Sequence, residues 1–428
     1  MTNAAVTMSS PSTRLAEPLS RRHIPALDGL RGVAILLVLG FHFAAAFPLV
    51  PESFAERLVD GLLQSGWCGV DLFFVLSGFL ITGILYDTKS TSRYFRNYYA
   101  RRVLRIFPLY YALLIACFVV IPRLSLLSTA DCSRISADQP WYWLFCSNLK
   151  IAMDGSPSFG FVSGLAALTW SLAIEEQFYL MWPLLVFACR RTTLLRICAV
   201  MVVGALALRV GLILADVPRA SIYVLTPCRF DGLALGAAIS LVLRGQIDPE
   251  RIRSIARKVL VVSGVALGGI FTWYGSLHAG LAITQSLGLT LLAFLFGALL
   301  TLAVLSSPEN RIVRIANMRG LRIFGKYSYA IYLLHQLVFA GIERAIPPSD
   351  LSRWLGSGLP AYFGCLIVVS ALSLLAAMAS WYLFERHFLR LKRFFEYSPK
   401  SPPVGGQRQP GHAPRRRSRL LQAAPKGR

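Results

Sequence analysis

Long runs of hydrophobic residues, separated by short polar stretches, extend over most of this chain of 428 residues. A membrane-spanning helix needs about 20 mostly apolar residues, and most of these runs approach or exceed that length. Ten candidate segments lie at roughly 30–49, 67–87, 106–122, 167–188, 197–215, 228–243, 258–275, 282–305, 322–342 and 358–384. The pattern therefore predicts an all-α fold, a polytopic membrane helix bundle of about ten transmembrane helices.

The polar stretches between these segments alternate in charge. Those near 88–105, 189–196, 244–258 and 306–321 are rich in Arg and Lys, whereas the intervening ones carry few basic residues. Cytoplasmic loops carry an excess of Lys and Arg, so this pattern places both termini in the cytoplasm. The net charge of +23 then reflects topology and contact with anionic membrane lipids, and it does not indicate a nucleic-acid partner.

The two ends and the cysteines complete the organisation of the chain. Residues 1–26 and 396–428 are polar and basic, so we expect disordered cytoplasmic tails on either side of a membrane domain at 27–395. The eight cysteines show no paired C-x-x-C spacing, and we expect no metal. Cys132 and Cys146 share one predicted outer loop, where they either form a disulfide or remain free thiols.

Three ionisable residues interrupt the first apolar segment, Asp28, Arg31 and His42. On a helix, Arg31 and His42 lie within about 20° of one face and about 16 Å apart along the axis. Ionisable groups are costly in lipid, so we expect them to face a protein interior or a watery cleft. Asp28 and Arg31 could form only an interfacial ion pair. His42 is the natural candidate for a proton carrier, because its ring titrates near neutral pH.

Two adjacent carboxylates, Glu175 and Glu176, lie inside the fourth segment, where simple packing does not account for them. Counting from the expected helix ends, they and His42 each lie roughly 12 Å below the outer surface. We therefore expect one of the carboxylates to orient the imidazole of His42.

A group of three arginines, Arg101, Arg102 and Arg105, follows the second segment in a predicted cytoplasmic loop. Guanidinium groups can bind phosphates with two parallel hydrogen bonds. The same residues could instead serve only to set topology beside lipid headgroups. Position alone favours the second interpretation.

Further polar residues lie within or at the ends of other segments. Arg229 and Asp231 begin the sixth segment and are interpreted as an interfacial polar contact, with substrate binding as the second possibility. In the ninth segment Tyr329, Tyr332 and His335 form one stripe, since residues three apart share a helix face. That stripe serves either contact between helices or a cavity.

Several of these motifs, in this order, resemble the acyltransferase-3 family of integral-membrane acyltransferases. The resemblance rests on Arg31-x10-His42 and on the sequences at 71–82, 101–108, 170–180 and 329–335, and it extends over about 24–395. It implies transfer of an acetyl or other acyl group from acyl-coenzyme A to a hydroxyl of a carbohydrate, glycolipid or macrolide. It also implies a multi-pass protein of the bacterial cytoplasmic (inner) membrane. Some members carry a further hydrolase-like domain, which we expect to be absent here.

The resemblance also assigns roles. It implies that His42 and Arg31 are essential, and that the arginine motif contacts the acyl-coenzyme A. Our hypothesis therefore assigns catalysis to Asp28, Arg31, His42, Glu175 and Glu176, cofactor binding to Arg101, Arg102 and Arg105, and substrate binding to Ser77, Trp170, Tyr332 and His335. His42 then acts as general base or as a transient acyl carrier.

A different class of protein would use the same buried groups. A proton-coupled transporter or flippase of a glycan or lipid could employ a His–Glu pair inside the membrane. Many transporters are built from internal repeats, and none is visible in this sequence.

Overall fold

The structure is a computed structural model that describes residues 23–49, 51–123, 137–156, 166, 168–345 and 358–397. Within those ranges the chain is helical and contains no β-strand. The predicted tails at 1–26 and 396–428 fall almost entirely outside the described residues. The α-helices are α1 (Pro25–Ala46), α2 (Phe54–Gln64), α3 (Gly69–Asp87), α4 (Tyr94–Ile115), α5 (Ile121–Arg123), α7 (Ser147–Asp154), α9 (Thr169–Ala188), α10 (Arg191–Leu214), α11 (Arg219–Val224), α12 (Phe230–Val242), α13 (Pro249–Tyr274), α14 (Leu289–Leu305), α15 (Arg311–Ala316), α16 (Arg319–Ala345), α18 (Leu359–Ser380) and α19 (Arg386–Arg390).

A helix lies at each of the ten predicted segments, which confirms the all-α fold class. Seven helical stretches of the described chain are long and apolar enough to cross a membrane. The helices in the other three segments are α9, α12 and α16; α12 has only 13 residues, and α9 contains the two carboxylates. A count of ten crossings and the cytoplasmic placement of both termini remain predictions.

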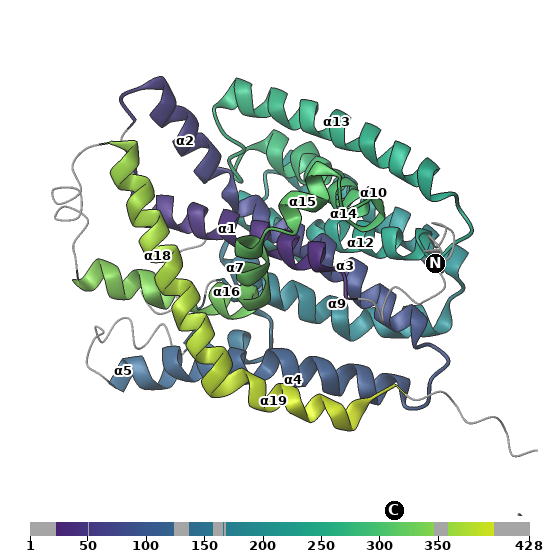
Figure 1. Cartoon of the computed structure of the whole chain (residues 1–428). Helices are drawn as coiled ribbons and strands as arrows, with labels where there is room; N and C mark the ends of the chain where they lie inside the picture. Colours follow the sequence, from purple (N-terminus) through teal and green to yellow (C-terminus); the bar gives the residue numbers. More distant parts are fainter. Residues whose placement is uncertain are drawn as a thin grey trace, which may run out of the picture.

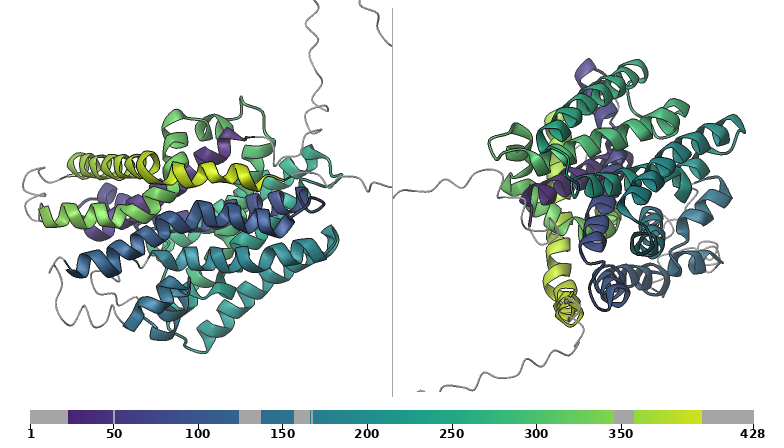
Figure 2. Two further views of the ribbon diagram at one scale, coloured as in Figure 1. Left: turned by 90° about the horizontal axis from the view of Figure 1, so that it is seen from below. Right: turned by 90° about the vertical axis from the view of Figure 1, so that its right-hand side faces the viewer.

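The long helices lie side by side with their axes roughly aligned (Figure 2). Helix α13 lies along one edge and α4 with α19 along the opposite edge, while α1 and α3 lie between them (Figure 1). Helix α1 packs against α3, α14, α16 and α18. The segment that carries Arg31 and His42 is therefore the central helix of the bundle.

Glycines bring the central helices into backbone contact. A Cβ at Gly325 of α16 would collide with the backbone oxygen of Asp28 on α1, and one at Gly78 of α3 would collide with that of Leu233 on α12. Small residues allow this close approach between membrane helices, where packing is a main source of association. The contact at Gly325 fixes the height of α1, and thus of Arg31, relative to α16.

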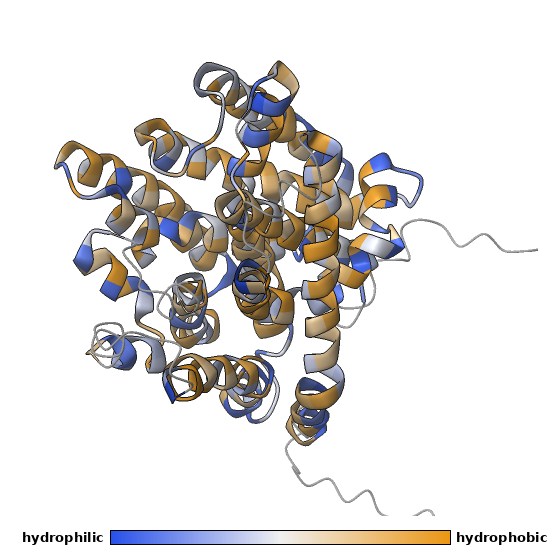
Figure 3. Cartoon of the chain, turned by 90° about the vertical axis from the view of Figure 1, so that its left-hand side faces the viewer, coloured by the Kyte–Doolittle hydropathy of each residue, from blue (hydrophilic) through white to orange (hydrophobic). Residues whose placement is uncertain are grey.

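The peripheral helices present apolar side chains outward. Only 17% of the apolar window of α10 is buried, and the same fraction of α13. Val203 and Val265 are 67% and 71% exposed. Hydrophobic positions cover most of the helical ribbon in Figure 3. These faces match a lipid environment, because hydrocarbon replaces the protein interior as their contact.

The polar stretches before and after α3 are largely helical, and the prediction of a loop for the second of them was wrong. The first outer loop contains the amphipathic helix α2, whose start is fixed by a capping box in which Glu56 accepts from the backbone of Ser53 (2.8 Å) and Ser53 accepts from that of Glu56 (3.2 Å). The arginine stretch is also not a loop, because α4 begins at Tyr94. The motif therefore occupies the first turns of the same helix that forms the third segment.

Candidate active site

A cavity of about 350 Å³ lies among α1, α3, α4, α9 and α16, and four cationic side chains line it. These are Arg31 of α1, Arg102 and Arg105 of α4, and Lys392, which follows α19. Glu175 is the single carboxylate among the described lining residues. We call this space the arginine cavity; its excess of positive charge suits a polyanionic ligand.

Arg31 is held in the cavity wall by Asp28. Its Nη1 donates to Asp28 Oδ1 over 3.2 Å, one helical turn earlier. The other oxygen of Asp28 lies 2.9 Å from His23 Nε2. Asp28 does not line the cavity, so the structure gives it an anchoring position and leaves the contact with a ligand to Arg31.

The three arginines of the motif do not act together. Arg102 lies over the rings of Tyr98 and Tyr179, 5.9 and 5.7 Å from their centroids, and faces the cavity with Arg105. Arg101 instead donates to the carbonyl oxygens of Lys392 and Phe395, over 3.2 and 3.3 Å. The prediction that all three bind one ligand is corrected here, because Arg101 and Arg102 are adjacent and point about 100° apart on a helix.

Sequence reasoning missed Lys392. It stands near the carboxyl end of the chain, among basic residues interpreted as topological. The structure brings it to the arginine cavity because Arg101 binds the backbone around it. The sequence offers one signal for Lys392: the last apolar segment is followed closely by Arg390 and Lys392. The same pattern occurs at ordinary cytoplasmic helix ends, so it does not distinguish a site residue.

The carboxylates of α9 do not meet His42, so the expected orienting contact is corrected. Glu175 Oε1 accepts from Ser77 Oγ of α3 over 2.6 Å and lines the arginine cavity. Glu176 has a buried oxygen, Oε1, without a hydrogen-bond partner among the described residues. The depth estimate alone could not give the direction in which each side chain points.

The partner of His42 is another histidine. His335 Nε2 lies 3.3 Å from His42 Nδ1, and His335 is fully buried. Each Nδ1 also lies near the carbonyl one turn earlier: His42 Nδ1 is 2.9 Å from Val38 O, and His335 Nδ1 is 3.0 Å from Ile331 O.

These contacts fix the tautomers. A carbonyl oxygen only accepts, so in each neutral ring Nδ1 carries the proton and Nε2 the lone pair. The N–H of His42 is then shared between Val38 O and His335 Nε2. The lone pair on Nε2 of His42 takes no part in these contacts, which leaves it available as a base.

His42 reaches a second cavity, of about 380 Å³, which we call the histidine cavity. Its wall is mostly aromatic and apolar, with Phe41, Trp170 and Tyr223 beside His42. Trp170 and Tyr223 lie with their ring centroids 5.0 Å apart. Aromatic surfaces of this kind bind small ligands, and the volume falls in the range of about 300–1,000 Å³ that such sites have.

The two cavities share no lining residue. On α9 the boundary between the two cavities falls between neighbouring residues, because Trp170 lines the histidine cavity and Ser171 lines the arginine cavity. Tyr332 of α16 reaches this boundary, where its hydroxyl lies 2.6 Å from Ser171 Oγ and 3.0 Å from Leu168 O. We call Ser171 and Tyr332 the boundary layer. The ring of Tyr332 lies 6.2 Å from that of His335. The predicted site residues Trp170, Tyr332 and His335 therefore lie at or beside this boundary layer, whereas Ser77 lines the arginine cavity.

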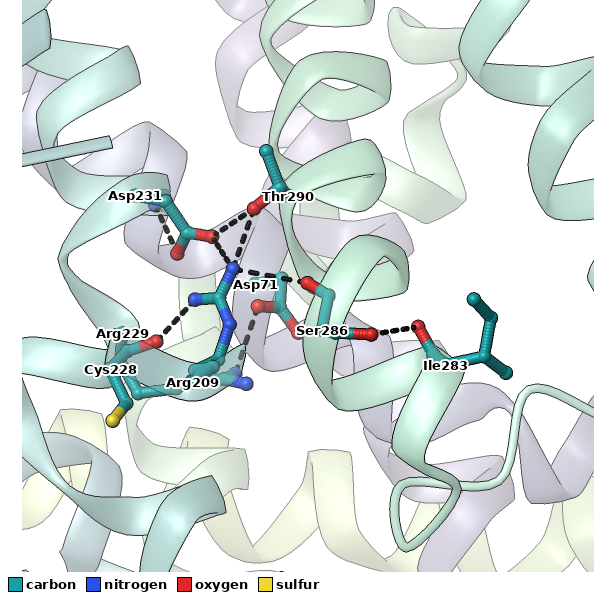
Figure 4. A network of polar contacts seen from close by, with 9 residues as sticks. Asp71, Arg209, Cys228, Arg229, Asp231, Ile283, Ser286 and Thr290 are labelled. Atoms are coloured by element: carbon teal, nitrogen blue, oxygen red, sulfur yellow. Dashed lines mark hydrogen bonds and ion pairs between the residues drawn. The ribbon is translucent and has the colours of Figure 1, made fainter. Parts of the chain in front are cut away.

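A buried group of two arginines and two aspartates joins α3, α10, α12 and α14 (Figure 4). Arg229 Nη2 contacts Asp71 Oδ1 over 2.8 Å, and Arg209 Nη2 contacts Asp231 Oδ2 over 2.8 Å. Thr290 of α14 accepts from Arg209 (2.5 Å) and donates to Asp231 (3.1 Å). The charges balance, as burial in a membrane protein requires.

This arrangement corrects the expected contact of Arg229 with Asp231. The two residues are close in sequence, but each pairs with a residue of another helix, Asp71 on α3 or Arg209 on α10. Arg209 was missed, although a single arginine inside an apolar segment is itself a signal. Arg229 also lies over Trp170 and Tyr223, 5.7 and 4.7 Å from their centroids, so this buried group supports the wall of the histidine cavity.

In the described ranges no group of three His, Cys, Asp or Glu side chains could hold a metal ion. Cys146 is a free thiol within those ranges. Cys132 lies outside the described residues, and its pairing stays a prediction.

Fold and site together describe a multi-pass helix bundle with one cationic cavity and a second cavity that contains His42. The sequence model of a family described as an acyltransferase domain matches residues 24–378. The chain therefore belongs to the acyltransferase-3 family.

Named relatives narrow the class. The chain is 30% identical to peptidoglycan O-acetyltransferase OatA of Listeria monocytogenes over 74% of its own length and 49% of the relative's. It is 28% identical to the putative peptidoglycan O-acetyltransferase YrhL of Bacillus subtilis, over 88% and 56%. It is 26% identical to O-acetyltransferase OatA of Staphylococcus aureus, over 90% and 61%.

The chain thus spans about half to three-fifths of the length of these relatives. No solved structure matches it. The family that matches is described as an acyltransferase domain and not as a transporter.

Proposed function

We propose that the protein transfers an acyl group, most simply acetyl, from acyl-coenzyme A on the cytoplasmic side to a hydroxyl of a cell-envelope saccharide. The family supports acyl transfer, and the relatives named for peptidoglycan support a saccharide acceptor. The observation that carries the proposal is the pair of adjoining cavities, one cationic and one containing His42.

The arginine cavity is the proposed donor site. Coenzyme A carries several phosphate charges, and guanidinium groups match phosphate geometry. Arg31, Arg102, Arg105 and Lys392 converge there from three parts of the chain. The predicted topology opens this end to the cytoplasm and its acyl-coenzyme A, in the bacterial cytoplasmic (inner) membrane, where the basic helix ends also meet anionic lipids.

The pantetheine arm would then point along α1 toward the boundary layer. Arg31 and His42 are separated by about 16 Å of helix, and Ser171 and Tyr332 lie on the way. In this proposal the thioester reaches the histidine cavity when the hydrogen bond between these two hydroxyls opens.

His42 is the proposed general base. The acceptor hydroxyl gives its proton to Nε2 of His42 while its oxygen bonds to the thioester carbonyl carbon. The carbon–sulfur bond then breaks, and the leaving thiolate takes the proton from the imidazolium. A positioned base of this kind supplies roughly 10²–10⁴ in rate. If the acyl group instead rests on His42 in transit, the same Nε2 is the nucleophile.

The test uses the full chain in proteoliposomes with acetyl-coenzyme A and a soluble saccharide, and it measures both free thiol and O-acetyl product. His42→Ala should abolish acceptor-dependent thiol release. His387→Ala is the matched control, since His387 is exposed and also has Nδ1 near a carbonyl, Phe384 O at 3.3 Å. Full activity of His42→Ala would remove this residue from the mechanism.

A further inference from the structure

Two polar atoms of residues that line the histidine cavity have no hydrogen-bond partner among the described residues. Arg219 Nη1 and Gln285 Oε1 are both buried, and neither forms a hydrogen bond within the described part of the chain. Both residues line the cavity that contains His42. A buried donor or acceptor without a partner costs about 1–3 kcal/mol, and more when it is charged, so these atoms point to a ligand that completes them.

The orientation of Gln285 is fixed. Its Nε2 donates to the backbone oxygen of Arg219 over 2.8 Å. A carbonyl only accepts, so the amide cannot be turned around, and Oε1 is the free atom. Gln285 is 1% exposed and lies in the π-helical turn Thr284–Gly288, which holds it against the start of α11. The cavity therefore presents one fixed acceptor that matches a hydroxyl donor.

Arg219 gives the cavity a charge. No Asp or Glu stands among its described lining residues, and Arg219 forms no ion pair within the described ranges. The second arginine nearby, Arg229, is already paired with Asp71. An oxyanion would thus meet an uncompensated guanidinium in a partly desolvated space, where such pairs are strongest.

We propose that the acceptor is an anionic saccharide. Its carboxylate, sulfate or phosphate group pairs with Arg219, a hydroxyl donates to Gln285 Oε1, and the ring lies on Trp170 and Tyr223. This inference deepens the proposed function. It rests on that function only in treating the bound saccharide as the acceptor, whereas the binding site itself rests on the geometry. A neutral sugar would leave Arg219 unpartnered, so the site selects for the anionic group.

The experiment measures binding without any acyl donor, so that it is independent of catalysis. Methyl β-D-glucuronide and methyl β-D-glucoside are titrated against the full chain in nanodiscs by saturation-transfer NMR. We expect the glucuronide to bind about 10-fold more tightly, the size of one charge-assisted hydrogen bond. Arg219→Gln should bring the ratio of the two dissociation constants close to one, and Arg219→Lys should restore part of it.

Two controls make the result specific. Arg123→Gln removes the same charge from an exposed arginine outside the cavity and should leave the ratio unchanged. Inorganic phosphate should compete only weakly. The inference is overturned if the unaltered protein binds both glycosides equally, if Arg219→Gln keeps the preference, or if phosphate alone binds as tightly as the glucuronide. Failure of acyl transfer with the preference intact would refute the proposed function and not this site.

Discussion

His335 offers the sharpest test of the catalytic geometry. Its Nε2 accepts from His42 Nδ1 over 3.3 Å, while its own Nδ1 is tied to Ile331 O. When His42 takes the proton of the acceptor, its N–H becomes part of a cation, and the hydrogen bond to His335 strengthens. His335 is therefore a positioning residue that stabilises the imidazolium, a role that a carboxylate has in many enzymes.

The magnitude follows from this change of charge. A neutral hydrogen bond contributes about 0.5–1.5 kcal/mol and one to a charged group about 1.5–3 kcal/mol. Replacing His335 by Phe removes the acceptor but keeps an aromatic ring in a fully buried position. The hydrogen bond gains about 1–1.5 kcal/mol when His42 becomes charged, so we expect kcat to fall roughly 5- to 13-fold, with little change in the KM for acyl-coenzyme A, whose proposed site lies in the other cavity.

The assay is acceptor-dependent thiol release over a range of both substrates. His335→Gln is the matched variant, because its amide oxygen can accept from His42, and it should recover part of kcat. Unchanged kcat in His335→Phe would refute the reasoning. Equal losses in both variants, together with a raised KM for the donor, would show that His335 only supports the packing of α16.

Three further predictions concern binding and stability. Arg102→Gln with Arg105→Gln should weaken coenzyme A binding about 10- to 100-fold, measured by calorimetry in detergent, because each arginine supplies charge-assisted hydrogen bonds. Asp71→Asn should lower stability by about 3–5 kcal/mol in a thermal or denaturant unfolding assay, since it leaves the buried charge of Arg229 unpaired. Gly325→Ala should cost about 1–3 kcal/mol, because its methyl group meets the backbone of α1.

Each of these three predictions has a control variant in the same protein. Arg251→Gln with Arg257→Gln removes two exposed arginines from α13 and should leave coenzyme A binding unchanged. Replacing both Asp71 and Arg229 by leucine should cost less than the single change, since no lone charge remains. Gly268 has no atom within 4 Å of an added Cβ, so Gly268→Ala should be neutral; equal effects at both glycines would contradict the packing argument.

The helices could be predicted from sequence because lipid leaves few choices. A backbone in hydrocarbon must satisfy its own hydrogen bonds, so a long apolar run is a helix. The predicted first residues were less accurate for helices whose N-terminal turns are basic. Hydropathy placed the third segment at 106, whereas α4 begins at Tyr94, and it placed the seventh at 258, whereas α13 begins at Pro249. Arginine is a good helix former, so these helices continue beyond their apolar part.

Several of the residues singled out from the sequence line cavities, but their pairing could not be predicted. His42, Arg31 and Arg102 line cavities, as the argument from costly buried charge suggests. Their partners come from distant parts of the chain, for example His335 for His42. Neighbours in sequence such as Glu175 and Glu176 point about 100° apart on a helix, so a motif read along the chain combines side chains that face different directions.

The boundary layer of Ser171 and Tyr332 also bears on how such a protein coexists with an energised membrane. The two cavities have no described lining residue in common, so the proposed donor and acceptor sites are separate spaces on either side of this layer. A hydroxyl pair in hydrogen-bonded contact would separate a donor in one compartment from an acceptor in the other. Under the proposed function, this contact would limit proton leakage between turnovers. Only the entry of the pantetheine arm would have to break the hydrogen bond between Ser171 and Tyr332.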